Sequence, residues 1–174
     1  MWKLERLRAA ERMSDKKTNA MRILDGLGIK YSVTGYDVDP DNLDALSAAS
    51  KLGVSPEKIF KTIVMRNDKN LIFVFCVSAE SEVNLKKARA VSGSKEIKPV
   101  KMTELLGLTG YIRGGCSPIG MKRKYPLFID ETATLFDEIY ISAGIRGKQI
   151  ILAPDDLVKA TDGTFADIAT TVAT

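Results

Sequence analysis

The sequence predicts an α+β fold in a single domain, with helices flanking a mixed, largely antiparallel β-sheet. Two apolar runs, 61–65 and 71–77, are joined by the polar stretch RNDKN, a pattern typical of a β-hairpin. Helical stretches alternate irregularly with such β-branched runs, which favours α+β over a regular βαβ repeat. The length of 174 residues corresponds to one ordinary domain, and no repeat, low-complexity tract or linker divides it.

The expected elements follow from capping residues, glycine stops and β-branched runs. Thr18 or Asn19 can cap the first helix, whose apolar stripe contains Leu27, and Asp155 can cap the last one. In the helix at 82–91 the expected core contacts are Val83, Leu85 and Ala90. The expected helices are 18–27, 43–52, 82–91, 101–106 and 155–161, with a helical turn at Ser55-Pro56; the expected strands are 31–36, 61–65, 71–77, 127–130, 138–142 and 149–152.

Residues 1–14 differ from the rest of the chain. They are helix-prone and charged, and Met13, followed by Ser14 and Asp15, offers a second translation start. We interpret them as an N-terminal extension, either disordered or the product of an upstream start, and 15–172 as the folded domain. No export signal is recognised, and the longest apolar run, 71–77, is far shorter than the ~20 residues of a membrane span. Two distant cysteines fit a reducing compartment, so we expect a cytoplasmic protein without membrane contact.

The chain contains no histidine, and this absence removes several mechanisms. Ser-His-Asp and Cys-His arrangements need an imidazole as base. Two cysteines without histidine also do not make the usual zinc ligand set, so no metal and no organic cofactor is expected. The formal charge of +4 and the pI of about 9.0 fit an anionic partner and an ordinary solvated surface equally well.

The stretch GGCSPIG at 114–120 is the first candidate site. Gly114 and Gly115 lack a Cβ, so a ligand can approach their backbone, and successive N–H groups can face an anion or a polarised carbonyl. A plain tight connection explains the same glycines. Cys116 resembles a nucleophile, yet a reactive thiol needs a lowered pKa, and we interpret Cys116 as a small hydrophobe. Cys76, inside the run 71–77, is expected in the core.

Lys61 is the second candidate, because strand alternation places it on the same face as Ile59, Ile63 and Met65. Such a lysine either extends to the edge of the sheet or serves a pocket, where it can hold a phosphate or carboxyl group. The basic stretch 84–90 can contact a nucleic-acid backbone or form a solvated helix face.

Several separated stretches, taken in order, resemble the YbaK/EbsC family. They are KTNAMRIL near the start, YDVDP at 36–40, FKTIVM around Lys61, NLKKA at 84–88, TGYIRGGCSPIG at 109–120, IYISAGIRG at 139–147 and LAPDDLVK at 152–159. The resemblance covers about residues 15–170 and rests on the order and spacing of the motifs. It implies the fold of that family, an α+β domain on a curved mixed sheet, as in the related editing domain of prolyl-tRNA synthetases.

The resemblance also implies site residues. In the family the lysine of the FKT motif is required and lies near the terminal adenosine of the substrate, and the glycine-rich loop offers backbone groups to the aminoacyl group. This implies catalytic roles for Lys61, Gly114 and Gly115. The implied substrate-binding residues are Tyr36, Thr62, Cys116, Ser117, Pro118, Ser142, Gly144 and Arg146.

The implied function is a trans-editing aminoacyl-tRNA deacylase that removes cysteine from mischarged Cys-tRNA(Pro). Family members are thought to let the thiol of the substrate attack its own ester, a route that needs no histidine. The implied partners are aminoacyl-tRNA, with tRNA(Pro) or tRNA(Cys) as the RNA, and prolyl-tRNA synthetase; the oligomeric state stays open. Two alternatives also stay open: a deacylase for another small amino acid, such as on Ala-tRNA(Pro), and a non-catalytic tRNA-binding or regulatory module.

Overall fold

The computed structural model of the 174-residue chain describes residues 2–5 and 16–171. Residues 2–5 are helical, and the rest of the predicted N-terminal extension lies outside the described residues. No helix among the described residues is long and apolar enough to cross a membrane.

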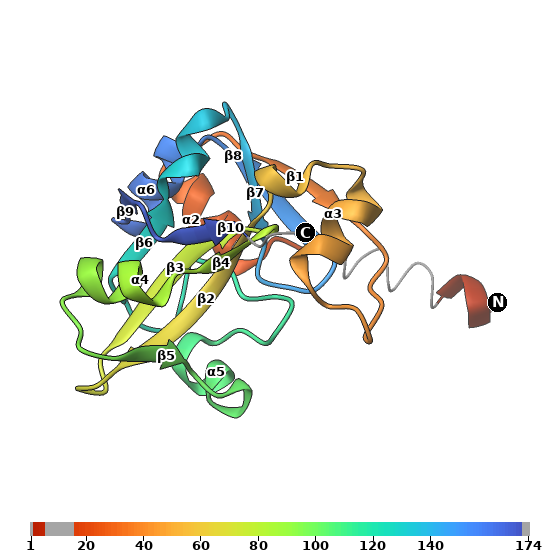
Figure 1. Cartoon of the computed structure of the whole chain (residues 1–174). Helices are drawn as coiled ribbons and strands as arrows, with labels where there is room; N and C mark the ends of the chain where they lie inside the picture. Colours follow the sequence, from red (N-terminus) through yellow and green to blue (C-terminus); the bar gives the residue numbers. More distant parts are fainter. Residues whose placement is uncertain (1, 6–15, 172–174) are drawn as a thin grey trace.

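A five-stranded sheet in the order β5-β2-β3-β6-β9 forms the centre of the domain (Figure 1). The predicted hairpin is confirmed: β2 (Phe60–Asn67) pairs antiparallel with β3 (Ile72–Ser78). On one side β5 (Ile97–Pro99) adds antiparallel to β2. On the other side β6 (Leu127–Asp130) and β9 (Thr164–Ala166) add in parallel, so the sheet is mixed.

Two smaller antiparallel sheets complete the framework. One has the order β1-β8-β7, from β1 (Ser32–Gly35), β8 (Lys148–Leu152) and β7 (Ile139–Ser142). An isolated bridge between Ile59 and Tyr140 joins it to the start of β2, so the two sheets meet at an angle. The other pairs β4 (Ser81–Val83) with β10 (Ala169–Thr171). The α+β prediction is confirmed, and the expected strands are divided between two of these three sheets.

Helices and short helical turns connect these strands, and most of the expected caps are present. Thr18 Oγ1 accepts a hydrogen bond from the N–H of Met21, and Gly53 ends its helix with a φ of 66°. The α-helices are α2 (Asn19–Gly26), α3 (Ala45–Leu52), α4 (Leu85–Ser92), α5 (Met102–Thr109) and α6 (Pro154–Thr161), and the 3-10 turns are η1 (Pro56–Lys58) and η2 (Glu131–Leu135).

Some local predictions are wrong. The helix expected at 82–91 begins only at Leu85, because β4 takes the preceding residues and Asn84 supplies the cap. Its buried core contact is Ala88, whereas Leu85 and Ala90 are exposed and Val83 is only partly buried.

At two helix ends the structure also differs from the prediction. Leu27 is 50% exposed: it is the C-cap that follows α2, whose buried residues are Ala20, Met21 and Leu24. Asp155 lies in the first turn of α6, and the N-cap position belongs to Ala153 because Pro154 already starts the helix.

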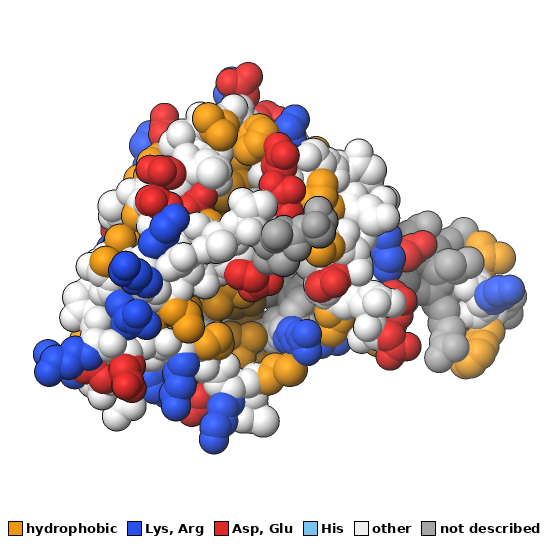
Figure 2. Space-filling view, in the orientation of Figure 1, with side chains coloured by type: hydrophobic (Ala, Val, Ile, Leu, Met, Phe, Trp, Pro, Cys, Tyr) orange, Lys and Arg blue, Asp and Glu red, His pale blue; other side chains and the backbone are white. Residues whose placement is uncertain are grey.

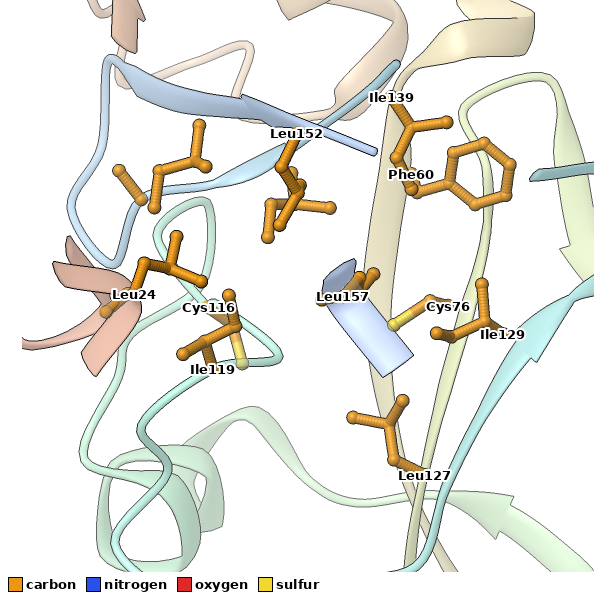
Figure 3. Close-up of a cluster of buried hydrophobic side chains, with 14 of the residues drawn as sticks. Leu24, Phe60, Cys76, Cys116, Ile119, Leu127, Ile129, Ile139, Leu152 and Leu157 are labelled. Carbon is orange, nitrogen blue, oxygen red and sulfur yellow. The ribbon is translucent and has the colours of Figure 1, made fainter. Parts of the chain in front are cut away.

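The central sheet is buried on both faces, which explains the uninterrupted apolar run at 71–77. Phe60, Val74 and Cys76 face a larger core that also contains residues of α2, α6 and the β7–β8 hairpin (Figure 3). Phe73, Phe75 and Val77 face a second core beneath α4. There the ring of Phe75 stacks on that of Phe128 at a centroid distance of 5.6 Å. The prediction that Cys76 is a core residue is confirmed.

Asp130, which is 2% exposed, ties the C-terminal strand to the central sheet. Its Oδ1 accepts hydrogen bonds from the N–H groups of Ile168 and Ala169, just before and at the start of β10, and its Oδ2 accepts from Thr132. Because β10 pairs with β4, this carboxylate indirectly holds Glu82 in place.

We expect Asp130→Ala to lower the free energy of unfolding by about 2–4 kcal/mol, because it leaves the buried N–H of Ile168 and the partly buried N–H of Ala169 without their acceptor. Urea unfolding of purified protein measures the change. Asp130→Asn, which keeps one acceptor, should lose less. A loss below about 0.5 kcal/mol for the alanine variant would show that these hydrogen bonds contribute little net stability.

Candidate functional site

A cavity of about 340 Å³ opens where the two larger sheets meet (Figure 2). Its walls come from α3 and the residues before it, β2, β4, the β7–β8 hairpin and the loop at 113–116. The hollow beside β2 has hydrophobic side chains inside and both acidic and basic side chains on its rim.

Six of the residues that the sequence singled out meet in this cavity, although they span more than a hundred positions of the chain. The tyrosine lies just after β1, the lysine and threonine lie on β2, and the serine ends β7. The glycine and cysteine come from the loop at 113–116. These residues are Tyr36, Lys61, Thr62, Gly114, Cys116 and Ser142.

Lys61 supplies a cation to the cavity. Its side chain is 22% exposed, and its Nζ donates to Glu82 Oε1 at 3.3 Å. Asp44 also lines the cavity, but it caps α3: hydrogen bonds from Ser47 lower the pKa of its carboxyl group, which makes Asp44 a poor proton acceptor. Of the two positions weighed for Lys61, at the edge of the sheet or in a pocket, the structure has the second.

Three residues of the loop at 113–116 line the cavity: Arg113, Gly114 and Cys116. Gly114 has a φ of 83°, which favours glycine, and a Cβ there would lie 3.3 Å from the side chain of Leu43. The Gly115 N–H is already engaged, because it donates to the carbonyl of Ile112 at 3.0 Å. Within the described part of the chain, the N–H groups of Gly114 and Cys116 have no acceptor, so these two groups are free for a ligand.

The other five predicted site residues lie behind the cavity wall. A Cβ on Gly115 would lie 3.0 Å from the backbone nitrogen of Arg146, and the Arg146 side chain donates in turn to the carbonyl of Arg113 at 2.9 Å. Gly144 accommodates the ring of Tyr111, which a Cβ would approach to 2.9 Å.

The last two of these five, Ser117 and Pro118, also support the loop from within. Ser117 is buried, and its Oγ accepts from the N–H of Ile119. Pro118 borders a different, smaller cavity. In this arrangement all five hold the loop in shape and do not line the 340 Å³ cavity.

Glu82 and Gln149 line the cavity, and the sequence interpretation missed both. Gln149 is 6% exposed, and its Oε1 is buried without a hydrogen-bond partner among the described residues. It lies between Thr34 and Ser142 in the strand register, so a polar row crosses the small sheet. A glutamine directly before the apolar run 150–152 was the available signal for Gln149. Glu82 had none, because it meets Lys61 only through the fold.

Neither thiol is activated. Burial raises the pKa of Cys116 to about 11 and that of Cys76 to about 12, so both are protonated at neutral pH. This agrees with the interpretation of Cys116 as a small hydrophobe, and it leaves the cavity without a nucleophilic thiolate.

Cys116→Ala is therefore expected to keep most of the catalytic activity, with kcat/KM within about threefold of wild type, because Ala keeps the backbone N–H and a small apolar side chain. The pH dependence of activity between pH 6 and 9 should also be the same for the wild type and Cys116→Ala, because a Cys116 thiol with a pKa of about 11 stays protonated there. Complete loss of activity in a folded Cys116→Ala variant would contradict this view.

The family model of the aminoacyl-tRNA editing domain matches residues 39–160, which include α3, the central hairpin, the loop at 113–116 and the β7–β8 hairpin. The chain belongs to the aminoacyl-tRNA editing domain family. The match starts after Tyr36 and includes the other residues that we place in the cavity.

Two individual relatives of this editing-domain protein are similar over much of its length, and the name of the first agrees with that assignment. It is 40% identical over 161 residues, 92% of its own length and 98% of the relative, to the Enterococcus faecalis protein named "Putative Cys-tRNA(Pro)/Cys-tRNA(Cys) deacylase EbsC". It is 26% identical to the uncharacterized protein YwhH of Bacillus subtilis, over 63% of the chain and 69% of that protein.

A solved structure supports the fold. The crystal structure titled as that of "a putative trans-editing enzyme for prolyl tRNA synthetase" superposes with a TM-score of 0.73 at 22% identity. The superposition covers 89% of this chain and 99% of the other chain. At this level of identity the likeness establishes the α+β editing-domain fold.

Proposed function

We propose that this protein is a trans-editing deacylase that removes cysteine from mischarged Cys-tRNA(Pro). One observation carries the proposal: the cavity combines the Lys61 cation with two free backbone N–H groups, at Gly114 and Cys116, and contains no activated thiol. Such a site is suited to bind and polarise an ester whose nucleophile comes from elsewhere. The name of the 40% identical relative agrees with this substrate.

The proposed reaction is an intramolecular transfer within the substrate. The cysteine sulfur attacks the carbonyl carbon of its own ester, a C–S bond forms, and the C–O bond to the terminal ribose breaks. The thiol proton passes to the ribose oxygen, and a four-membered thiolactone leaves. The protein holds sulfur and carbonyl at reacting distance, while the N–H groups of Gly114 and Cys116 stabilise the charge that develops on the carbonyl oxygen.

Lys61 has a separate task in this proposal. As a compact cation in the same cavity as the free N–H groups, it binds the phosphate or the ribose oxygens of the terminal adenosine and fixes the ester in the cavity. Tyr36, Thr62 and Ser142 complete the walls around the ester. Gly115, Ser117, Pro118, Gly144 and Arg146 act by holding the loop and the hairpin in position.

A panel of mischarged tRNAs tests the proposal. Purified protein should release the amino acid from Cys-tRNA(Pro), and Cys-tRNA(Cys) measures the contribution of the RNA. Ser-tRNA and Ala-tRNA carry no thiol and should react at least about 100-fold more slowly, because the internal nucleophile contributes a large effective concentration. Equal rates on Ala-tRNA(Pro) would instead favour hydrolysis by water, and RNA binding without any deacylation would favour a non-catalytic module.

The proposed function also implies a cellular compartment and a protein partner. Aminoacyl-tRNA is consumed by protein synthesis, so we place the reaction in the cytoplasm. A domain of this size contacts little of the tRNA body, and we propose that prolyl-tRNA synthetase supplies the selection of tRNA(Pro). Adding the synthetase to the panel should then raise the rate on Cys-tRNA(Pro) relative to the rate on Cys-tRNA(Cys).

A further inference from the structure

A second cavity, of about 600 Å³, lies beyond the first one, between β2, β5 and the start of α5. Four cationic side chains line it: Arg66, Arg89, Lys98 and Lys101. Lys98 and Lys101 are exposed, so their ammonium groups are available to a partner. Lys and Arg side chains gather over α4 and β5 on this face of the molecule (Figure 2).

Positive charge is concentrated in the segment that forms this surface. Residues 84–101 contain six Lys or Arg residues and one acidic residue, a formal charge of +5, whereas the whole chain carries +4. The remainder of the chain is therefore slightly acidic, at −1. A uniformly solvated surface does not require this separation, whereas a polyanionic partner does benefit from it.

Two of the three carboxylates in the cavity are already engaged. Glu104 accepts from Arg66 Nη1 at 2.9 and 3.0 Å, and this hydrogen bond holds the pKa of Glu104 low. Asp68 accepts from two backbone N–H groups, those of Lys95 and Glu96, which also lowers its pKa.

The third carboxylate is Glu96, which is exposed at the rim. In the described part of the chain, Arg89, Lys98 and Lys101 form no ion pair. Three cations of the cavity are thus left for a ligand.

One side-chain contact links the wall of the first cavity to the segment beside the second. Arg113 lines the first cavity, and its Nη1 lies 3.8 Å from the Sδ of Met102, which directly follows Lys101 in the wall of the second cavity. Between them the surface is apolar and open: Met102 is 60% exposed and Leu106, one turn further along α5, is 56% exposed. Exposed apolar groups bordered by cations suit a single strand of RNA, whose bases are apolar on their faces and whose backbone is anionic.

We propose that the second cavity binds the phosphodiester backbone at the acceptor end of the same aminoacyl-tRNA whose aminoacylated terminus occupies the first cavity. This inference rests on the proposed function. Lys98 and Lys101 pair with phosphate oxygens, and Met102 and Leu106 contact the bases of the unpaired 3′ end. The RNA backbone thus fixes the register of the terminal ester relative to Lys61.

The test compares two substrates for the double variant Lys98→Ala/Lys101→Ala. On full-length Cys-tRNA(Pro), kcat/KM should fall about tenfold or more, and its dependence on salt should become less steep by about 1.5 in log–log slope, because each lost phosphate contact removes about 0.7–0.9. On the cysteinyl ester of adenosine, which has no phosphodiester backbone, kcat/KM should stay at the wild-type value.

The matched control is Lys159→Ala, an exposed lysine on α6 outside both cavities, which should change neither the rate nor the salt slope. An unchanged salt slope and rate on tRNA for the double variant would overturn the inference while leaving the deacylase proposal intact. If the wild type hydrolyses neither substrate, the proposed function fails. The affinity for uncharged tRNA, with and without the two lysines, then tests the surface alone, and equal affinities would overturn it.

Discussion

Lys61→Ala is expected to lower kcat/KM for deacylation of Cys-tRNA(Pro) by about 10²–10³-fold, the usual cost of removing one preorganised polar group from an active site. The side chain is only 22% exposed and reaches the cavity through a central strand, so no neighbouring cation of β2 can take its place. The measurement is the rate of loss of labelled cysteine from the tRNA, with protein concentration above and below that of the substrate.

Two variants separate the charge of Lys61 from its shape and its partner. Lys61→Arg keeps the cation but not the compact ammonium geometry, and it should recover only part of the rate. Glu82→Gln removes the partner of the ion pair; because the Glu82 side chain is 66% exposed, the pair contributes little, and the rate should change by less than about fivefold. Undiminished turnover in a folded Lys61→Ala variant would remove Lys61 from the site.

The second large effect is expected for Gln149→Leu, which should keep or raise the stability of the protein while it weakens substrate binding. The Oε1 of Gln149 is buried without a partner among the described residues, and an unsatisfied buried acceptor costs about 1–3 kcal/mol. A leucine of similar size removes this cost, so urea unfolding should show equal or greater stability. We propose that this oxygen accepts a hydrogen bond from the α-ammonium of the aminoacyl group, so its loss should raise KM by about 10–100-fold.

A third variant distinguishes this role from simple packing. Gln149→Glu keeps an acceptor and adds a charge, and it should bind the ammonium at least as well as glutamine does. If the leucine variant instead loses stability and keeps its KM, Gln149 is a packing residue, and its unpaired oxygen has no part in substrate binding.

Much of the fold could be predicted from local patterns. The hairpin of β2 and β3 follows from two β-branched runs around a polar turn, and Thr18 and Gly53 mark helix ends by the chemistry of their own backbone neighbourhoods. The three-residue strands β4, β5, β9 and β10 were not predicted, because such short segments have no periodicity of their own and form only against a neighbouring strand.

The candidate site, too, could be predicted only in part from the sequence. Its composition was available from the sequence: no histidine, a lysine on an apolar face and a glycine-rich loop. Which N–H groups of the loop are free was not available, because the turn that engages Gly115 depends on the carbonyl of Ile112. Glu82 and Gln149 reach the cavity only through strand pairing with β10 and with β1 and β7.

By itself, then, the sequence determined the secondary structure of the longer elements, the absence of imidazole chemistry and the residue types of the site, because these depend on neighbours along the chain. Tertiary structure alone decided that Lys61 lines the same cavity as Gly114 and Cys116 with their free N–H groups, that Gln149 lines it too with an oxygen unpaired among the described residues, and that a contact between Arg113 and Met102 links its wall to a second, cationic cavity. These features bring together segments that are far apart in sequence, and they depend on how the sheets and the loop pack together.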